Sequence, residues 1–471
     1  MQTYYVRPNG PLASSVESFR LSTVDHMVTQ HYSIWAIIFK LENADVVAIS
    51  EGFKRALETT LGQCRHFVGK IGVNEHGDFS VMKKAESTVR LDIRRLDDPQ
   101  DKYPSFSQLE SGMFSAPYLG DPALFTIEGM TMACGHHPQT GVDASGFQLT
   151  FIPGGLIFTV HRHHLICDVT GLASLVRQIA DNCKAVFKGA SAPHWDESLM
   201  DRSRFITPAV AEKDQKEPPP APKRHPDWLP CSWLLFHIPQ GKVAELKKSA
   251  TPVDGTWIST YDALIAFIWR VVTKNRAHIY KPDLSQPAIF MEAVNMRNRL
   301  IDPQVPERYQ GNLVCGGLSV LQENPLSLAE VISGAPLSRL AAFIRQVTQS
   351  VTPGTLENML KAAAPIKDKT TLHARMDSAP PMSLAATDWR RAPICDYDFG
   401  IGRPVAARLV ADTVFENMVM LYPQRAVEGI EGPGPGLEVV VPFEKHVIQM
   451  LTEDPEMTEY FEFRGIEASR S

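Results

Sequence analysis

The stretch "FQLTFIPGGLIFTVHRHHLICDVTG", residues 147–171, decides the fold class of this chain. Apolar and β-branched residues flank Gly154 and Gly155, which predicts two strands joined by a tight turn. Beyond Asp168 the apolar residues recur at helical spacing, so we expect a helix that Asp168 caps and Gly189 ends. The apolar positions of that helix are Leu172, Leu175, Val176, Ile179, Val186 and Phe187.

The same mixture of patterns continues on both sides of this stretch. Upstream, "SIWAIIFKL" (33–41) predicts a buried strand and "EGFKRALETTLGQC" (51–64) predicts a helix. Downstream, "FHIPQGKVAELKKSA" (236–250) predicts a strand followed by a helix. Two further strands are expected in "PAIFMEAVNMR" (287–297) and "GLEVVVPF" (436–443). Alternation of strands and helices along the whole chain favours an α/β (α+β) fold.

A long helix is expected in "STYDALIAFIWRVVTKNR", residues 259–276. Ser259, Thr260 or Asp262 lies where such a helix begins, and Lys274 and Arg276 lie where it is expected to end, which suits the helix dipole.

The connector "EKDQKEPPPAPKRHPDW" (212–228) divides the chain near its middle. Consecutive prolines lack the N–H groups that a helix or central strand needs, so this run predicts an extended, semi-rigid link. A length of 471 residues exceeds one ordinary core, which makes two domains the natural expectation.

The composition excludes several classes of protein. Hydrophobic residues make up 44% and charged residues 21%, as in a globular protein, and the net charge of −6 argues against nucleic-acid binding. Neither a signal-peptide layout nor an apolar run near the ~20 residues of a membrane helix is present, so a cytoplasmic location is expected. Seven scattered cysteines without a C-x-x-C pair predict neither a disulfide framework nor a structural zinc site.

His164 is the sharpest candidate for chemistry, because it follows a strand directly before a helix. An imidazole titrates near neutrality and can act as a general base. A metal site is the second reading, but His161 and His163 share the strand face opposite to His164, so the three rings do not converge. Cys167 as a nucleophile is a third reading, and its apolar neighbours favour a buried thiol. The spacing H-x-x-x-D alone leaves these readings open.

A second motif lies in "CDYDFGIGRP", residues 395–404. Asp398, Gly400 and Gly402 form D-F-G-x-G, in which the glycines permit a tight turn. D-F-G occurs in kinases, but the chain has neither a glycine-rich nucleotide loop near its front nor an H-R-D loop, so a kinase is rejected.

With H-x-x-x-D followed far downstream by D-F-G-x-G, the chain resembles the BAHD family of CoA-dependent acyltransferases. Further matching segments keep the expected order over nearly the whole chain. With its doubled histidine, the chain is similar to fungal secondary-metabolism members of the family, such as trichothecene acetyltransferases. These segments are "LSTVD" (21–25), "ALETTLGQCRHFVGKI" (56–71), "STYDALIAFIWR" (259–270), "AVNMRNRL" (293–300) and "GLEVVVPF" (436–443).

The resemblance implies two chloramphenicol-acetyltransferase-like domains, each a mixed sheet flanked by helices. Residues 1–205, with a segment around 400–425, would form the first domain, and residues 231–471 the second. Residues 206–230 would form the crossover loop, and a channel between the domains would hold the site.

The resemblance also implies roles for individual residues. His164 would be the general base, and Asp168 would turn away from it to pair with Arg297 of the N-x-R stretch. Asn295, His163, Asp398, Gly400 and Gly402 would support the site structurally. Two departures from the family pattern are Ile401 in place of the usual tryptophan and Val169 in place of a frequent glycine, which here appears at Gly171.

The expected reaction is acyl transfer from acyl-CoA, with acetyl as the expected group, to a hydroxyl or an amine of a specialised metabolite. No metal, no permanently bound cofactor, no nucleic acid and no membrane partner are expected, and the protein is expected to be a monomer. Ser259, Thr260 and Asp262 are candidates for binding the co-substrate, while Thr159, Asn295 or a backbone N–H is a candidate oxyanion donor.

Two alternatives stay open at this stage. A condensation-type domain also doubles the histidine, but takes its acyl group from a carrier protein. An inactive acyl-CoA or metabolite-binding protein would keep the fold without turnover.

Overall fold

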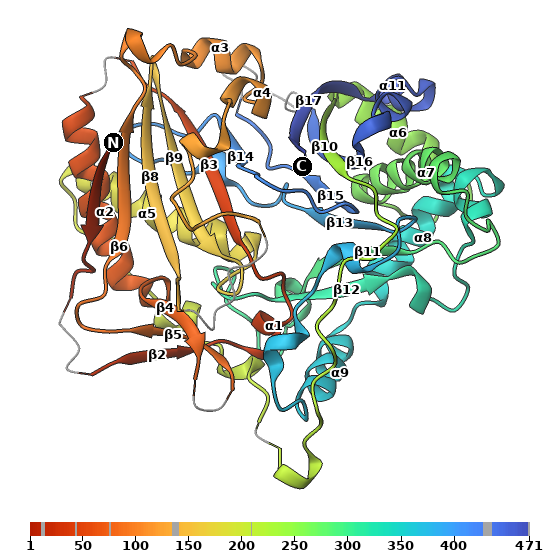
Figure 1. Cartoon of the computed structure of the whole chain (residues 1–471), viewed down its shortest axis with the longest axis horizontal. Helices are drawn as coiled ribbons and strands as arrows, with labels where there is room; N and C mark the ends of the chain where they lie inside the picture. The colour runs from red at the N-terminus through yellow and green to blue at the C-terminus, as the bar shows by residue number, and fades with distance from the viewer. Residues whose placement is uncertain are drawn as a thin grey trace.

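The computed structural model describes residues 1–10, 15–42, 45–74, 77–133, 141–208, 210–426 and 436–469. In this part of the chain the strands form two large mixed sheets and one small sheet, with helices packed against them (Figure 1). The two large sheets lie side by side; the first is built from the N-terminal half together with one strand from the C-terminal half, and the second is built from the C-terminal half.

The first sheet contains the hairpin that the sequence predicts around Gly154 and Gly155. Strands β8 and β9 pair antiparallel around the turn at Gly154, as expected, and β9 also pairs with the buried strand β3. Helices α2 and α5 cover one face of this sheet, where apolar side chains from helices and strands share one core. In spatial order the strands are β1 (Gln2–Val6), β6 (Val89–Arg95), β8 (Ser145–Ile152), β9 (Gly155–His163), β3 (Tyr32–Lys40) and β14 (Ala406–Leu409), and the helices are α2 (Val46–Gln63) and α5 (Val169–Lys188).

The second sheet has seven strands and its own core beneath helices α6, α7 and α8. In spatial order its strands are β12 (Val314–Leu318), β11 (Phe290–Asn295), β13 (Leu384–Asp388), β15 (Met418–Leu421), β16 (Leu437–Glu444), β10 (Cys231–Ile238) and β17 (Glu462–Ser469). The helices are α6 (Gln240–Ala250), α7 (Thr260–Tyr280) and α8 (Leu337–Ser350).

The remaining elements are short, apart from α9. A small sheet of β2 (Glu17–Arg20), β5 (Phe79–Lys83), β4 (Lys70–Val73) and β7 (Val142–Asp143) was not foreseen from the sequence. The other α-helices in the described ranges are α1 (Thr23–His26), α3 (Phe106–Ser111), α4 (Ala116–Leu119), α9 (Pro353–Ala363), α10 (Gln449–Thr452) and α11 (Pro455–Tyr460).

Strand β14 joins the two halves, because it adds to β3 of the first sheet while the next strand, β15, lies inside the second sheet. Arg408 of β14 is fully buried, and its Nη2 lies 2.8 Å from a carboxylate oxygen of Glu438 on β16. A buried, hydrogen-bonded ion pair thus connects the sheets at the point where the chain crosses between them.

The expected end of helix α7 was wrong. The helix continues to Tyr280 and stops at Lys281, which adopts a left-handed conformation with φ of 48°. Lys274 lies within the helix and pairs with Asp454 at 3.0 Å, and Arg276 is buried against Glu444 at 3.0 Å. Both cations therefore serve contacts with neighbouring elements rather than the helix dipole.

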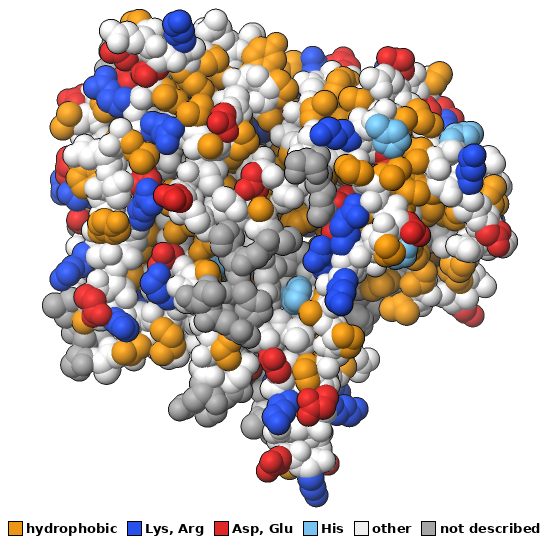
Figure 2. Space-filling view, in the orientation of Figure 1, with side chains coloured by type: hydrophobic (Ala, Val, Ile, Leu, Met, Phe, Trp, Pro, Cys, Tyr) orange, Lys and Arg blue, Asp and Glu red, His pale blue; other side chains and the backbone are white. Residues whose placement is uncertain are grey.

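The proline-rich connector follows the expectation of an extended link after a single 3₁₀ turn at Glu212–Asp214. It leads into β10, the first strand of the second sheet along the chain. Within the described ranges, none of the helices is long and apolar enough to cross a membrane. On the face seen in Figure 2, acidic and basic side chains are interspersed.

The cysteines in the described part of the chain are buried free thiols: Cys64, Cys167, Cys183, Cys231, Cys315 and Cys395. Cys134 lies outside the described residues.

Four buried histidines predict that stability falls at mildly acidic pH. Burial lowers the pKa of His26, lowers those of His31 and His66 well below their usual range, and lowers that of His161 to about 3. The unfolded chain takes up protons near pH 6.5 and the folded chain does not, so stability present above this pH is lost below it. Between pH 7.5 and 5.5 we expect a loss of about 1 kcal/mol per histidine, measured by urea denaturation.

His66 supplies the matched variant for this prediction. Its ring packs 4.4 Å from that of Phe67, and neither ring nitrogen has a hydrogen-bond partner among the described residues. We expect His66→Leu to reduce the pH-dependent loss by the share of one histidine, about 1 kcal/mol, since one proton uptake on unfolding is removed. An unchanged pH dependence in this variant would contradict the assignment.

Candidate active site

The candidate site centres on the turn between β9 and α5. Strand β9 ends at His163, and Ile166 N–H donates to the His163 carbonyl at 3.0 Å to close the turn. Asp168 caps α5, as the sequence predicted, because its Oδ1 accepts from Gly171 N–H at 2.8 Å. The sequence therefore places His164 in the short non-helical segment between a strand and a helix.

His164 is half-buried at the start of this turn. Its backbone N–H donates to the His31 carbonyl at 2.8 Å, and the two imidazole rings lie 5.2 Å apart. Burial lowers the pKa of His164 well below its usual range, and the nearby Arg162 guanidinium lowers it further. The imidazole is therefore neutral near pH 7, the form that accepts a proton.

Asp168 faces away from the imidazole and toward Arg297. The guanidinium binds the carboxylate through two hydrogen bonds, Nη1 to Oδ2 at 2.9 Å and Nη2 to Oδ1 at 3.0 Å. Leu313 N–H adds a further bond to Oδ2 at 2.9 Å. Both charged side chains are buried, so they neutralise one another at the contact between the two halves of the chain.

Asn295 extends this contact. Its Oδ1 accepts from the backbone N–H and Nη1 of Arg297, and its Nδ2 donates to the Thr170 hydroxyl at 3.1 Å. As an oxyanion donor, Thr159 is badly placed. Its hydroxyl points to the Gln148 carbonyl, and at ~3.3 Å per strand residue it lies roughly 16 Å from His164.

His163 and His161 are buried on the other face of β9. The His163 ring packs edge-on against Tyr32 at 5.1 Å, and His161 Nε2 accepts from Ile127 N–H at 3.1 Å. Neither ring turns toward His164 in these contacts. Across the ranges that the structure describes, no group of three or more His, Cys, Asp or Glu side chains is placed to hold a metal ion.

Cys167 is a buried thiol, as the sequence favoured. Burial raises its pKa to about 11, so it stays protonated at physiological pH. A protonated thiol is a weak nucleophile.

The D-F-G-x-G loop lies at the far end of α5. Asp398 accepts from Gly400 N–H at 2.8 Å and pairs with Lys184 of α5 at 3.0 Å, and these two groups hold its pKa below the usual range. Gly400 has φ of +82°, and a Cβ there would lie 3.0 Å from the Lys184 Cα, so only glycine fits. Gly402, with φ of +128°, completes the turn.

The distance between the two motifs follows from the helix that joins them. Helix α5 has 20 residues and spans ~30 Å, with His164 just before its first turn and the glycine loop packed on its last. The loop can fix the helix but does not reach the reacting groups.

Ser259 and Asp262 form a reciprocal cap at the start of α7. Asp262 N–H donates to Ser259 Oγ at 3.2 Å, while Ser259 N–H donates to Asp262 Oδ2 at 2.6 Å. These side chains, with Thr260 as the first helical residue, explain why the helix begins here. Their part in binding a co-substrate stays a prediction.

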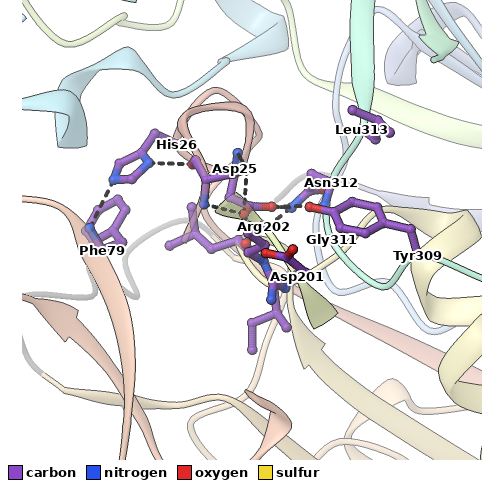
Figure 3. Close-up of polar contacts among 12 residues, drawn as sticks. Asp25, His26, Phe79, Asp201, Arg202, Tyr309, Gly311, Asn312 and Leu313 are labelled. Carbon is purple, nitrogen blue, oxygen red and sulfur yellow. Dashed lines mark hydrogen bonds and ion pairs between the residues drawn. The ribbon is translucent and has the colours of Figure 1, made fainter. Parts of the chain in front are cut away.

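Three residues at the turn were not identified as site residues from the sequence. Asn312 Nδ2 donates to the carbonyls of His164 and Leu165, and Arg202 Nη2 donates to that of Ile166. The Asp25 carboxylate accepts hydrogen bonds from both Asn312 and Arg202 (Figure 3). The motif "LSTVD" pointed to Asp25 only as part of a resemblance, because contacts between distant segments leave no local pattern.

Comparison with known proteins adds to this geometry. A model described as the Transferase family matches residues 140–458, and one described as the trichothecene 3-O-acetyltransferase-like N-terminal domain matches residues 31–183. The chain is 40% identical to acetyltransferase FGR3 of Gibberella zeae, over 96% of this chain and 91% of that protein. It is 26% identical to trichothecene 3-O-acetyltransferase TRI101 of Fusarium sporotrichioides, over 89% of this chain and 90% of the relative.

The fold has a solved counterpart. The crystal structure of Fusarium sporotrichioides TRI101 complexed with coenzyme A and T-2 is similar to this chain with a TM-score of 0.75 at 21% identity. The match covers 95% of this chain and all of that one. The predicted fold class, mixed sheets flanked by helices, is confirmed.

The buried pair of Asp168 and Arg297 generates a stability prediction. Asp168→Asn leaves the guanidinium buried without a countercharge, so the free energy of unfolding should fall by about 3–5 kcal/mol in urea denaturation. Asp181→Asn is the control, because its partner Arg177 lies 3.9 Å away on the exposed face of the same helix. The control should lose less than about 1 kcal/mol. Equal losses in both variants would refute the structural role of the pair.

Proposed function

The chain belongs to the Transferase family, the BAHD acyltransferases, and we propose that it transfers an acetyl group from acetyl-CoA to a hydroxyl of a small specialised metabolite, with His164 as the general base. The family that the sequence resembles is thereby confirmed, and the chain is an acyltransferase that uses acyl-CoA as its co-substrate. Acetyl as the transferred group is supported by acetyltransferase FGR3, 40% identical over 96% of this chain.

One observation carries the assignment of the base. The backbone of His164 is bonded to His31 of the N-terminal half and to Asn312 of the C-terminal half, which fixes the residue where the two halves meet. The Asp168 carboxylate does not compete for the imidazole, because it is engaged with Arg297, Gly171 and Leu313. The imidazole is therefore left to act on a substrate.

The reaction then follows from the chemistry of the groups. The neutral imidazole takes the proton of the acceptor hydroxyl while the oxygen attacks the thioester carbonyl, and a tetrahedral oxyanion forms. Its collapse breaks the carbon–sulfur bond, and the CoA thiolate regains the proton from the imidazolium. Because the pKa of His164 is depressed, in part by Arg162, the imidazolium gives up its proton readily. No covalent enzyme intermediate is required, since the thioester is already activated and binding supplies proximity.

The pairing of the strands supports a division of the chain into two domains. We infer one domain from residues 1–205 with a segment around 400–425, and a second from residues 231–471, linked by residues 206–230. The pairing of β14 with β3 supports the placement of residues 406–409 in the first domain, since it brings them into the first sheet, whereas β15 (Met418–Leu421) pairs within the second sheet. The acceptor would reach His164 through a channel between these domains.

The acceptor is proposed as an alcohol of a fungal terpenoid, alkaloid or polyketide, on the basis of relatives such as TRI101, named as a trichothecene 3-O-acetyltransferase. An amine is the alternative nucleophile, and a carrier-protein thioester the alternative donor. Incubation of the pure protein with radiolabelled acetyl-CoA and panels of alcohols and amines, without any carrier protein, separates these cases. The labelled product shows which nucleophile accepts the acetyl group, and a condensation-type domain would not use the free thioester. A binding protein without turnover would leave the acetyl-CoA intact even with acceptors added.

The general base is tested by His164→Ala. We expect the loss of ~100- to 10,000-fold in acetyl transfer from acetyl-CoA, with a melting temperature close to that of the unaltered protein. The assay screens T-2 together with panels of terpenoid, alkaloid and polyketide alcohols and of amines. Cys167→Ala is the control and should keep its activity, because the protonated thiol takes no part. Full activity of His164→Ala would show that His164 is not the general base.

A further inference from the structure

Asp25 is a buried carboxylate with more hydrogen bonds than its local role requires. It lies in α1, a helix of four residues, and its Oδ2 accepts from the backbone N–H of Ser22 at 2.7 Å and from the Ser22 hydroxyl at 2.8 Å. These bonds complete the cap of a single helical turn. The side chain is fully buried, so the remaining capacity of the carboxylate must be satisfied by other segments.

Two distant segments supply the other donors (Figure 3). Asp25 Oδ1 accepts from both the backbone N–H and the Nδ2 of Asn312, at 2.9 and 2.8 Å. Asp25 Oδ2 also accepts from Arg202 Nε at 3.1 Å. The carboxylate therefore joins the N-terminal helix, the segment that follows α5 and the C-terminal half, and its charge is balanced by the guanidinium.

Asn312 and Arg202 also donate hydrogen bonds to the turn that carries His164. Asn312 Nδ2 donates to the His164 carbonyl at 3.0 Å and to the Leu165 carbonyl at 3.2 Å. Arg202 Nη2 donates to the Ile166 carbonyl at 2.7 Å. Three consecutive carbonyls of a segment that is neither strand nor helix are thus fixed by two side chains that share one anchor.

The anchor itself is held in place. His26, next to Asp25, accepts from Phe79 N–H of β5 through Nε2 at 2.9 Å, so its Nδ1 carries the proton and donates to the Ser22 carbonyl at 2.8 Å. The imidazole also stacks on the Phe79 ring, 5.0 Å between centroids. Helix α1 is therefore tied to the small sheet, and Asp25 cannot follow a shift of the turn.

We propose that Asp25 is a positioning residue of the acyltransferase: through Asn312 and Arg202, it fixes the backbone of the turn and so the position of the His164 imidazole. The proposal rests on the role of His164 proposed above. It is separate from the Asp168–Arg297 pair, which holds the other end of the same turn. The side chain does not touch a reacting group, so its effect is expected on the imidazole and on turnover rather than on acetyl-CoA binding.

The first measurement needs no acceptor. With ¹³C-labelled histidine, the imidazole signal of His164 is assigned by its loss in His164→Gln and titrated by NMR. In Asn312→Ala and Asp25→Asn the released turn admits water to the ring, so its midpoint should move upward toward the usual histidine range. An unmoved midpoint in both variants would overturn the proposal.

The second measurement is kinetic, on the folded fraction of each variant. We expect kcat for acetyl transfer to fall at least tenfold in Asn312→Ala and further in Asp25→Asn, with KM for acetyl-CoA within threefold. The double variant Asp25→Asn/Asn312→Ala should have a kcat within about twofold of that of Asp25→Asn alone, because both residues act through the same bonds. Should Asp25→Asn fail to fold, Asn312→Ala carries the test, since it keeps the carboxylate and Arg202. Losses that multiply, or an unchanged kcat, would contradict the proposal.

Asp454→Asn is the matched control. Asp454 is also a buried helix-capping carboxylate, and it accepts from an asparagine amide (Asn275, 3.0 Å) and a cation (Lys274, 3.0 Å) far along the C-terminal half. We expect a lower melting temperature with unchanged kcat and an unmoved His164 titration. His164→Ala is assayed in parallel. If His164→Ala stays active, the assignment of the general base is wrong. If His164→Ala is inactive while Asn312→Ala and Asp25→Asn are fully active, only the positioning role of Asp25 is wrong.

Discussion

The structure depends on how the turn between β9 and α5 satisfies its buried polar groups. Residues 164–168 belong to no ladder, so most of their carbonyls and the Asp168 carboxylate need donors from elsewhere. Those donors come largely from residues 297–313, in the other half of the chain. The bonds of this turn are therefore complete only when both halves are in contact, which gives a physical reason for the proposed position of the site between them.

The contact between halves is secured away from the turn as well. Strand β14 adds to the first sheet, and Arg408 on it pairs with Glu438 of the second. Removal of either ion would leave the other buried without a partner, so such a pair resists separation of the sheets even where its net contribution to stability is small. Rigid attachment matters for the general base that we propose, since a shift of about 1 Å can cost a hundredfold in rate.

Sequence patterns predicted the elements whose signals are local. The hairpin of β8 and β9, helix α5 and its two caps follow from periodicity and from the chemistry of Asp168 and Gly189. The network around Asp25 could not be predicted, because Asp25 and Asn312 are 287 residues apart and neither belongs to a periodic pattern. The end of α7 was misplaced for a related reason: Arg276 is a charged residue that its partner Glu444 makes compatible with a buried helix.

The late arrival of β14 has a consequence for biosynthesis. Until residues 406–409 leave the ribosome, β3 has no neighbour on its outer side, and its apolar residues and backbone groups lie at an open sheet edge. At ~5–20 residues per second, the interval between the end of α5 and the end of β14 lasts roughly 10–45 s. During that time the nascent N-terminal half is a natural client for chaperones that shield exposed strands.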